Sequence, residues 1–273
     1  MALNLDTIPI KCINLRRRED RWRDFVSQPG LVKFQGKIGR YEAVDAENLD
    51  ISKDSNVSIQ VLYNIKNNER RSHHEIVSKG SIACYYSHTN LWKWLLEETN
   101  APALCVMEDD LKLEPDSYAK LAALLQDPAV ATGHWDIFNP GAFAGERIPI
   151  NDAICEYKRS FLFHCYIITR KGAEKLLKTA FPIQMHVDHY ASYTAAVGNI
   201  KIIGPCKRLM YQRNDKSDNR TDFKCNACSV PTMANPQHGR YISTPRVKLY
   251  EIEESILVIG ALLVGLYLWK RRF

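Results

Sequence analysis

Three consecutive carboxylates, Glu108, Asp109 and Asp110, directly follow the apolar run of residues 103–107. In open α/β sheets, ligands bind beyond the carboxyl ends of the strands, which is where such a run ends. Carboxylate oxygens are hard ligands that suit Mg²⁺ or Mn²⁺ held jointly with substrate phosphates. The triplet therefore predicts a divalent metal site, with an acidic surface loop as the alternative. Alternation along an extended chain would place Glu108 and Asp110 on one side and Asp109 on the other.

A cluster of arginines follows the first apolar run, at positions 16, 17, 18, 21 and 23. Guanidinium groups bind phosphate in a bidentate manner, so the cluster is suited to a nucleotide at the end of a strand. Acidic residues at 19, 20 and 24 lie among the arginines. A solvated helix face with internal ion pairs is therefore the alternative, and the cluster alone favours it.

The elements that must position these groups alternate between strand and helix, which is typical of an α/β fold. Apolar runs predict strands over residues 9–15, 41–45, 103–107, 135–138 and 161–168. Helical propensity and spacing predict helices over residues 16–24, 80–97, 116–126 and 171–177. The polar residues 46–79 predict a long surface loop. His164, inside an apolar strand, is expected to be a satisfied core histidine.

The composition is that of a soluble globular domain, with 273 residues, 45% hydrophobic and 25% charged. It excludes a disordered tail, a collagen-like rod and a polytopic membrane protein. The net charge of +6 is mild, and we expect no nucleic-acid partner.

The C-terminal residues differ from the rest, because residues 255–269 carry no charge and Lys270, Arg271 and Arg272 follow them. As a helix this stretch spans about 22 Å, against a hydrocarbon core of about 30 Å. Interfacial Tyr267 and Trp269 can cover the deficit. We predict a single-pass membrane anchor, with a buried core helix as the alternative. The expected organisation is one large α/β domain over 1–222, a polar arm over 223–252 and a hydrophobic helix with a basic tail over 253–273.

Eight cysteines are present, and five lie in or beside apolar runs, where cysteine behaves as a small buried hydrophobe. The N-terminal residues lack the features of a signal peptide. We therefore expect a reducing compartment and a catalytic domain that faces the cytosol, although the basic tail leaves the orientation open. Cys225 and Cys228 have the spacing of a zinc pair, and Cys206 and His238 are possible partners. Two thiols in a loop are the favoured alternative.

Six motifs in order give the chain a resemblance to a known family. They are INLRRREDR (13–21), YEAVDA (41–46), GSIACYYSHTNLW (80–92), VMEDD (106–110), WDI (135–137) and YIITRKGA (166–173). The set resembles glycosyltransferase family 25, the lipopolysaccharide-biosynthesis and procollagen galactosyltransferase group. Asp188-His189, Gln212 and Ser217-Asp218 match later blocks more loosely, and the resemblance covers about residues 9–220. Ala46 and Ala83 stand where the family usually has glycine.

The resemblance implies a GT-A-like single domain with a mixed, mainly parallel sheet, followed here by the C-terminal hydrophobic helix. It implies a UDP-sugar donor, a divalent cation (Mn²⁺ or Mg²⁺), and inverting transfer of a hexose, galactose or glucose. The acceptor would be a glycan, a lipid-linked sugar or a protein. The positions that match the donor-binding motifs are Asn14, Arg16, Arg21, Ala43, Asp45, Ser87 and His88.

The same resemblance assigns the metal to Glu108, Asp109 and Asp110. Asp188 is the expected general base, with a helix-capping role at Tyr190 as the alternative. The alanines at 46 and 83 would crowd a site where backbone approaches ligand. They motivate a second hypothesis, a catalytically inactive glycosyltransferase-like membrane protein with a binding or structural role. A third hypothesis is a metal-dependent hydrolase of nucleoside diphosphates.

Overall fold

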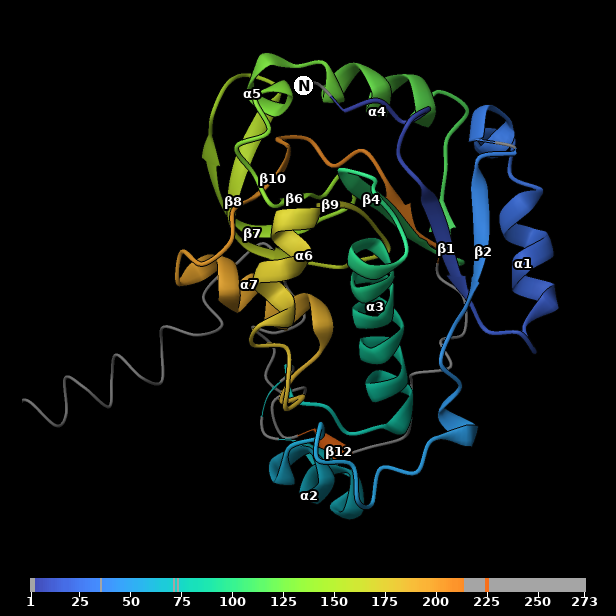
Figure 1. Ribbon diagram of the computed structural model, residues 1–273, viewed down its shortest axis with the longest axis vertical. Helices are drawn as coiled ribbons and strands as arrows, with labels where there is room; N and C mark the ends of the chain where they lie inside the picture. Colours follow the sequence, from blue (N-terminus) through green and yellow to red (C-terminus); the bar gives the residue numbers. More distant parts are fainter. Residues whose placement is uncertain (1–2, 35, 71, 73, 214–223, 226–273) are drawn as a thin grey trace, which may run out of the picture. The chain divides into compact units, whose positions relative to one another are not determined.

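The central strands of the fold are apolar runs of the sequence, and they are buried on both faces. The computed structural model describes residues 3–34, 36–70, 72, 74–213 and 224–225. Eight strands form one sheet in the order β2-β1-β4-β9-β6-β10-β8-β7 (Figure 1). In that order the strands are Ile38–Glu42, Ile10–Asn14, Ala103–Glu108, Cys165–Thr169, Ile137–Phe138, Ile202–Pro205, Ile154–Phe161 and Phe143–Pro149.

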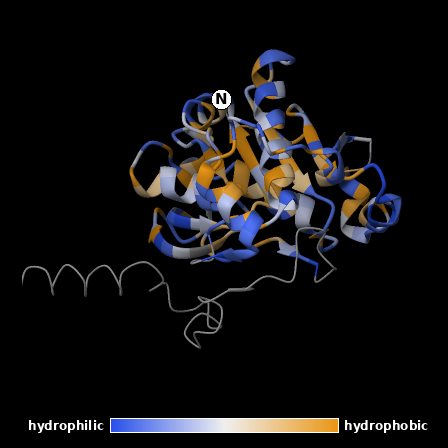
Figure 2. Ribbon diagram, turned by 90° about the horizontal axis from the view of Figure 1, so that it is seen from below, coloured by the Kyte–Doolittle hydropathy of each residue, from blue (hydrophilic) through white to orange (hydrophobic). Residues whose placement is uncertain are grey.

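Helices cover both faces of the sheet, and each face has its own apolar cluster. On one face lie α3 (Lys79–Glu97), α6 (Arg170–Leu177) and α7 (Val187–Ala196). The other cluster includes residues of α1 (Glu19–Val26), the 3-10 helix η1 (Pro29–Phe34), α4 (Ser117–Leu125) and α5 (Pro128–Ala131). Strand residues alternate between the clusters, as Val106 belongs to the first and Met107 to the second. Figure 2 shows this hydrophobic interior beneath a hydrophilic periphery.

The α/β class predicted from the sequence is confirmed, but the mainly parallel sheet is wrong. The pairs β2-β1, β1-β4 and β6-β10 are parallel, whereas β4-β9, β9-β6, β10-β8 and β8-β7 are antiparallel. Two features cause the difference. Residues 143–161 fold back on themselves as the β7–β8 hairpin, and β9 enters the centre of the sheet against the direction of β4. The GT-A assignment itself stays a prediction.

Residues 46–79 are not the long surface loop that their polarity predicts. They contain η2 (Ala46–Asn48), α2 (Ile59–Asn67) and β3 (Glu69–Arg70). Ser58 caps α2 by accepting the backbone N–H of Val61 at 3.3 Å. Val61 and Ile76 are fully buried, so a few apolar side chains anchor the segment.

Other predicted elements are displaced at their ends. The second strand is β2, three residues earlier than the predicted 41–45. The predicted strand 161–168 is broken between β8 and β9, where Leu162 has a φ of 71°. Small two-stranded sheets pair β5 (Leu111–Lys112) with β11 (Tyr211–Gln212), and β3 with β12 (Lys224–Cys225).

The described cysteines include buried thiols, the half-buried thiol of Cys84 and a disulfide. Cys12, Cys105 and Cys165 are buried thiols, as predicted. Cys155 and Cys206 form a disulfide that ties β8 to the segment after β10, which is not expected of a chain predicted to face a reducing compartment. The compartment itself stays a prediction.

The predicted C-terminal features lie outside the described residues. These are the membrane segment 255–269, the helix 253–273 and Cys228 of the zinc pair, together with all of the polar arm 223–252 except β12. Within the described part of the chain, no helix has the length and apolar character needed to cross a membrane.

Candidate functional site

The neighbouring parallel strands β1 and β4 end beside one pocket, which we call the carboxylate pocket. Four stretches of the chain supply most of its lining, and Gln212 joins them from β11. The polar or small lining residues used below are Asn14, Arg17, Arg21, Ala43, Asp45, Ala46, Ala83, Cys84, Ser87, His88, Glu108, Asp109, Asp110 and Gln212.

Backbone and side-chain hydrogen bonds hold the walls of this pocket together. The N–H of Ala43 donates to the carbonyl of Asn14 at 3.0 Å, which fixes the segment after β2 against the end of β1. The N–H of Val44 donates to Ser87 Oγ at 2.9 Å, and that hydroxyl donates to the carbonyl of Ala83 at 2.8 Å. Ser87 is buried, so α3 and the β2–η2 segment meet through one hydroxyl group.

Asp109 is occupied by contacts with α1 and β1. Its Oδ1 lies 2.7 Å from Nη2 of Arg21, and its Oδ2 accepts Nδ2 of Asn14 at 2.6 Å. Burial raises the pKa of Asp109, and Arg21 and Asn14 act in the opposite direction. The same Arg21 nitrogen lies 3.3 Å from Asp110 Oδ2. Asp109 and Asp110 therefore share a partner, and β4 ends at Glu108, so the regular alternation of a strand does not extend over the whole triplet.

Asp110 has an unsatisfied oxygen. Its Oδ2 accepts Nε2 of Gln212 at 2.8 Å, whereas its Oδ1 is buried and has no hydrogen-bond partner among the described residues. Burial and the nearby Glu108 carboxylate raise the pKa of Asp110 to about 7. A divalent cation would satisfy Oδ1 and favour the ionised carboxylate, so Asp110 and Glu108 fit a metal. Asp109 is already engaged by Arg21 and Asn14.

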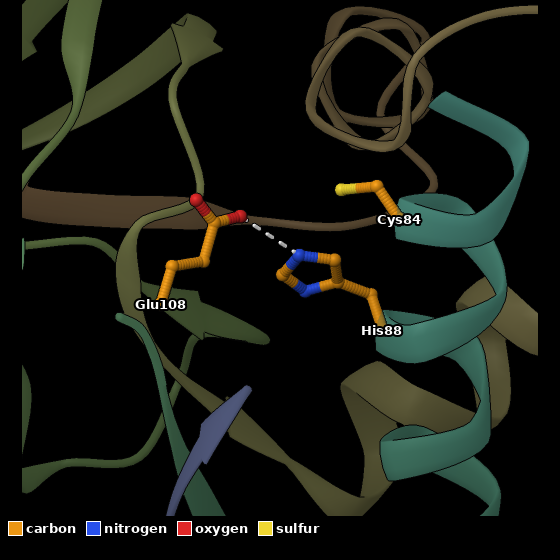
Figure 3. Close-up of side chains that lie close together, drawn as sticks. All are labelled: Cys84, His88 and Glu108. Atoms are coloured by element: carbon orange, nitrogen blue, oxygen red, sulfur yellow. Dashed lines mark hydrogen bonds and ion pairs between the residues drawn. The ribbon is translucent and has the colours of Figure 1, made fainter. Parts of the chain in front are cut away.

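Glu108 points toward His88 on α3, as Figure 3 shows. Its Oε1 lies 3.0 Å from His88 Nε2. On the other side of the imidazole, Nδ1 lies 2.9 Å from the hydroxyl of Tyr166, which accepts Nε1 of Trp92 at 2.8 Å. Burial acts to raise the pKa of Glu108, but the hydrogen bond from His88 outweighs it and the pKa lies below its usual range.

Asp188 lies in a second pocket, which we call the Asp188 pocket. It shares Cys84, Glu108 and Gln212 with the carboxylate pocket, so the two adjoin. Its remaining lining residues are Ser81, Leu162, Phe163, His164, His186, Val187 and Asp188.

Asp188 lies in the first turn of α7, and two backbone N–H groups donate to its carboxylate. Its Oδ2 accepts the N–H of Leu162 at 2.9 Å, and its Oδ1 accepts the N–H of His189 at 2.8 Å. Burial raises its pKa, but His189, His186 and these two donors outweigh burial and bring the pKa below its usual range. The carboxylate is thus ionised at neutral pH. The N-cap residue of α7 is His186, so Asp188 does not have the helix-capping role that was the alternative. Instead, its carboxylate links the backbone of Leu162 to the first turn of α7.

His164 is not the satisfied core histidine that its apolar neighbours predict. It is buried and lines the Asp188 pocket, and its Nδ1 has no hydrogen-bond partner within the described residues. Burial lowers its pKa to about 4, so the ring is neutral at pH 7.

The predicted donor residues, apart from Arg16, line the carboxylate pocket. Arg16 is exposed and outside the lining, whereas Arg17, which the motif comparison passed over, lines it with Nε 2.9 Å from Asp45 Oδ2. Cys84 and Gln212 were also missed as site residues. Cys84 precedes His88 by one helical turn, a spacing that signals a shared face, but nothing local to Gln212 indicates its place.

Comparison with known proteins agrees with this geometry. The model of glycosyltransferase family 25 (LPS biosynthesis protein) matches residues 8–139. The chain is therefore similar to that family over slightly less than half of its length. Procollagen galactosyltransferase 1-A of Xenopus laevis is 28% identical over 184 residues, which are 63% of this chain and 28% of that protein. The chain therefore corresponds to less than a third of the length of that relative.

Two further similarities bear on interpretation. A human protein named inactive glycosyltransferase 25 family member 3 is 26% identical over 129 residues, 47% of this chain and 21% of that protein. A crystal structure of a protein from STIV covers 78% of this chain and 98% of its own, at 13% identity and a TM-score of 0.36. A score that low establishes no shared fold. Strands β1, β2 and β4 and helix α3 lie within the matched residues 8–139, whereas Asp188 and Gln212 lie beyond them.

Proposed function

We propose that the chain is a glycosyltransferase that moves a hexose, galactose or glucose, from a UDP-sugar to a glycan, lipid-linked or protein acceptor. The main observation behind this proposal is that distant motifs of the sequence meet at one pocket. Motifs that are far apart in the sequence, from residue 13 to residue 110, line one pocket that contains four carboxylates and two arginines. The similarity to a protein named procollagen galactosyltransferase supports the reaction class.

The residues of the carboxylate pocket suit a nucleoside diphosphate. Arg17 and Arg21 offer guanidinium groups to phosphate oxygens. Mn²⁺ or Mg²⁺ held by Glu108 and Asp110 would offset the negative charge that develops on the diphosphate leaving group. The unpartnered Oδ1 of Asp110 supports this assignment. Asp109 keeps a positioning role, because it fixes Arg21 and Asn14.

Asp188 is the proposed general base. Its low pKa keeps it ionised, and it lies in the adjoining pocket, where an acceptor hydroxyl can approach from the side opposite the leaving group. Direct attack from that side forms the new C–O bond as the bond to the diphosphate breaks, which inverts the anomeric carbon. The hydroxyl proton passes to the carboxylate of Asp188.

Ligand-dependent stability of the full chain tests the nucleotide site. UDP at about 100 times its dissociation constant should add about 2.7 kcal/mol when Mn²⁺ is present. Asp110→Asn should abolish the metal-dependent part. Asp116→Asn is the matched control, because its exposed pair with Lys120 lies on α4, outside the pocket lining. No stabilisation of the unmodified chain by UDP and Mn²⁺ would contradict the proposal.

Turnover separates the proposal from its alternatives. With UDP-galactose or UDP-glucose and a panel of acceptors, we expect transfer that Asp188→Asn abolishes without loss of UDP binding. Ala46 and Ala83 both line the pocket, and this favours an inactive member as the second candidate. Donor binding without transfer or hydrolysis would support that candidate. Free sugar released equally with and without acceptor would support a hydrolase.

The membrane attachment is proposed from residues 255–269 alone, with the large domain facing the cytosol. Carbonate extraction of membranes from cells that produce the full chain tests it. Leu262→Arg should release the protein, because an arginine at the centre of a span costs about 2.5–3.5 kcal/mol on insertion.

A further inference from the structure

We propose that Cys84, His88 and Glu108 form a binding site for Zn²⁺, distinct in chemistry from the hard-cation site of Glu108 and Asp110. The proposal goes beyond the glycosyltransferase assignment and does not depend on it. Figure 3 shows the three side chains converging from α3 and the end of β4.

The spacing of the three groups is close to that of a zinc site. Cys84 and His88 are four residues apart in α3, so they lie on the same face of the helix. Their ligand atoms and a carboxylate oxygen of Glu108 all lie within 4.8 Å of one another. Ligands of a tetrahedral zinc, at about 2.0–2.3 Å from the ion, are about 3.5 Å apart. Metal binding would therefore have to draw the most distant pair of ligand atoms closer together.

The donor set selects the metal. Thiolate and imidazole together favour Zn²⁺ over Mg²⁺ and Mn²⁺, which prefer oxygen ligands. Three protein ligands leave a fourth position open, as in zinc sites that bind water or substrate. Cys84 and Glu108 line both the carboxylate pocket and the Asp188 pocket, so the open position would face the space where the two pockets adjoin.

A buried outer shell already orients the imidazole. His88, Tyr166 and Trp92 are all fully buried. The Tyr166 hydroxyl contacts His88 Nδ1 at 2.9 Å and is held by Trp92 Nε1, so Nε2 is directed toward Glu108. The phenol oxygen can accept from Nδ1–H as well as from Trp92, so a metal that replaces the Nε2–H bond to Glu108 can bind the tautomer with its proton on Nδ1. Partners of this kind are typical of metal-ligating histidines.

Co²⁺ binding to the full chain tests the site through its spectrum. We expect one Co²⁺ per chain with a near-ultraviolet thiolate-to-cobalt charge-transfer band that Zn²⁺ abolishes by displacement. Cys84→Ser should remove the band and weaken Zn²⁺ binding by more than about 100-fold, because even outer-shell substitutions weaken it by about 10- to 100-fold. Tyr166→Phe should keep the band and weaken binding within that smaller range.

A matched control excludes the other cysteine pair. The double variant Cys225→Ser and Cys228→Ser should keep the band. Asp110→Asn should also keep it while losing the Mn²⁺-dependent response to UDP, so this proposal and the proposed function can fail separately. Absence of the band from the unmodified chain, or its persistence in Cys84→Ser, would overturn the zinc assignment.

Discussion

Replacing Arg21 with methionine tests the electrostatics of the carboxylate pocket directly. Nη2 of Arg21 lies 2.7 Å from Asp109, and both side chains are only 10% exposed. At an effective dielectric constant of about 20, the attraction over that distance is about 6 kcal/mol before desolvation is subtracted. Breaking a buried pair by removing one partner typically costs about 3–5 kcal/mol, because the other charge is left uncompensated. We therefore expect Arg21→Met to lower the free energy of unfolding by about 3–5 kcal/mol.

Arg17→Met is the matched control. Arg17 also contacts an aspartate, Asp45, at 2.9 Å, but its side chain is 40% exposed and its charge is screened by water. Exposed pairs contribute about 0.2–1 kcal/mol, so this variant should lose no more than about 1 kcal/mol.

Urea unfolding at pH 7 measures both variants from their midpoints and m-values. Mn²⁺ should restore part of the stability lost in Arg21→Met, because the cation replaces the missing positive charge and binds only the folded state. Equal losses in the two variants would show that burial does not strengthen the Arg21 pair and would refute the reasoning.

Three further outcomes are expected. Because the pKa of Asp110 is raised from 3.8 to about 7, its stabilising contribution is present below pH 3.8 and is lost as the pH rises toward 7. In metal-free buffer the wild type should therefore gain about 2.3 kcal/mol relative to Asp110→Asn between pH 7 and pH 5, as measured by urea unfolding. Cys155→Ala with Cys206→Ala opens a 51-residue loop and should cost about 4 kcal/mol in thermal melts, and a thiol reductant should destabilise only the wild type. Ser87→Ala leaves the N–H of Val44 without its acceptor and should cost about 1–3 kcal/mol, whereas the exposed Ser27→Ala should change stability by less than about 0.5 kcal/mol.

The sequence predicts those parts of the site that depend only on residues close together in the chain. The strand that ends in Glu108 and the helix that carries Ser87 and His88 are recognisable because residue type and spacing determine each of them within a few residues. The parallel neighbours β1 and β4 then bring the two motif ends to one edge of the sheet.

Features that depend on distant residues could not be predicted in this way. Gln212 reaches Asp110 only because β11 pairs with β5, about 100 residues away. Antiparallel pairing arises where β7 and β8 form a hairpin and where β9 runs opposite to β4. An apolar pattern indicates that a segment is a strand, but it does not indicate in which direction the strand runs. The disulfide between Cys155 and Cys206 likewise reflects the pairing of β8 with β10.

The position of β9 affects how the chain must be made. β9 pairs with β4 on one side and β6 on the other, yet it is translated about 60 residues after β4. Synthesis proceeds at about 5–20 residues per second, so the apolar edge of β4 stays unpaired for roughly 3–12 s before β9 has been synthesised. An unpaired apolar edge is a site of aggregation. A fragment that ends at residue 139, where the family match ends, would lack β9 and leave that edge of β4 unpaired. The end of the family match is therefore not the end of a folding unit.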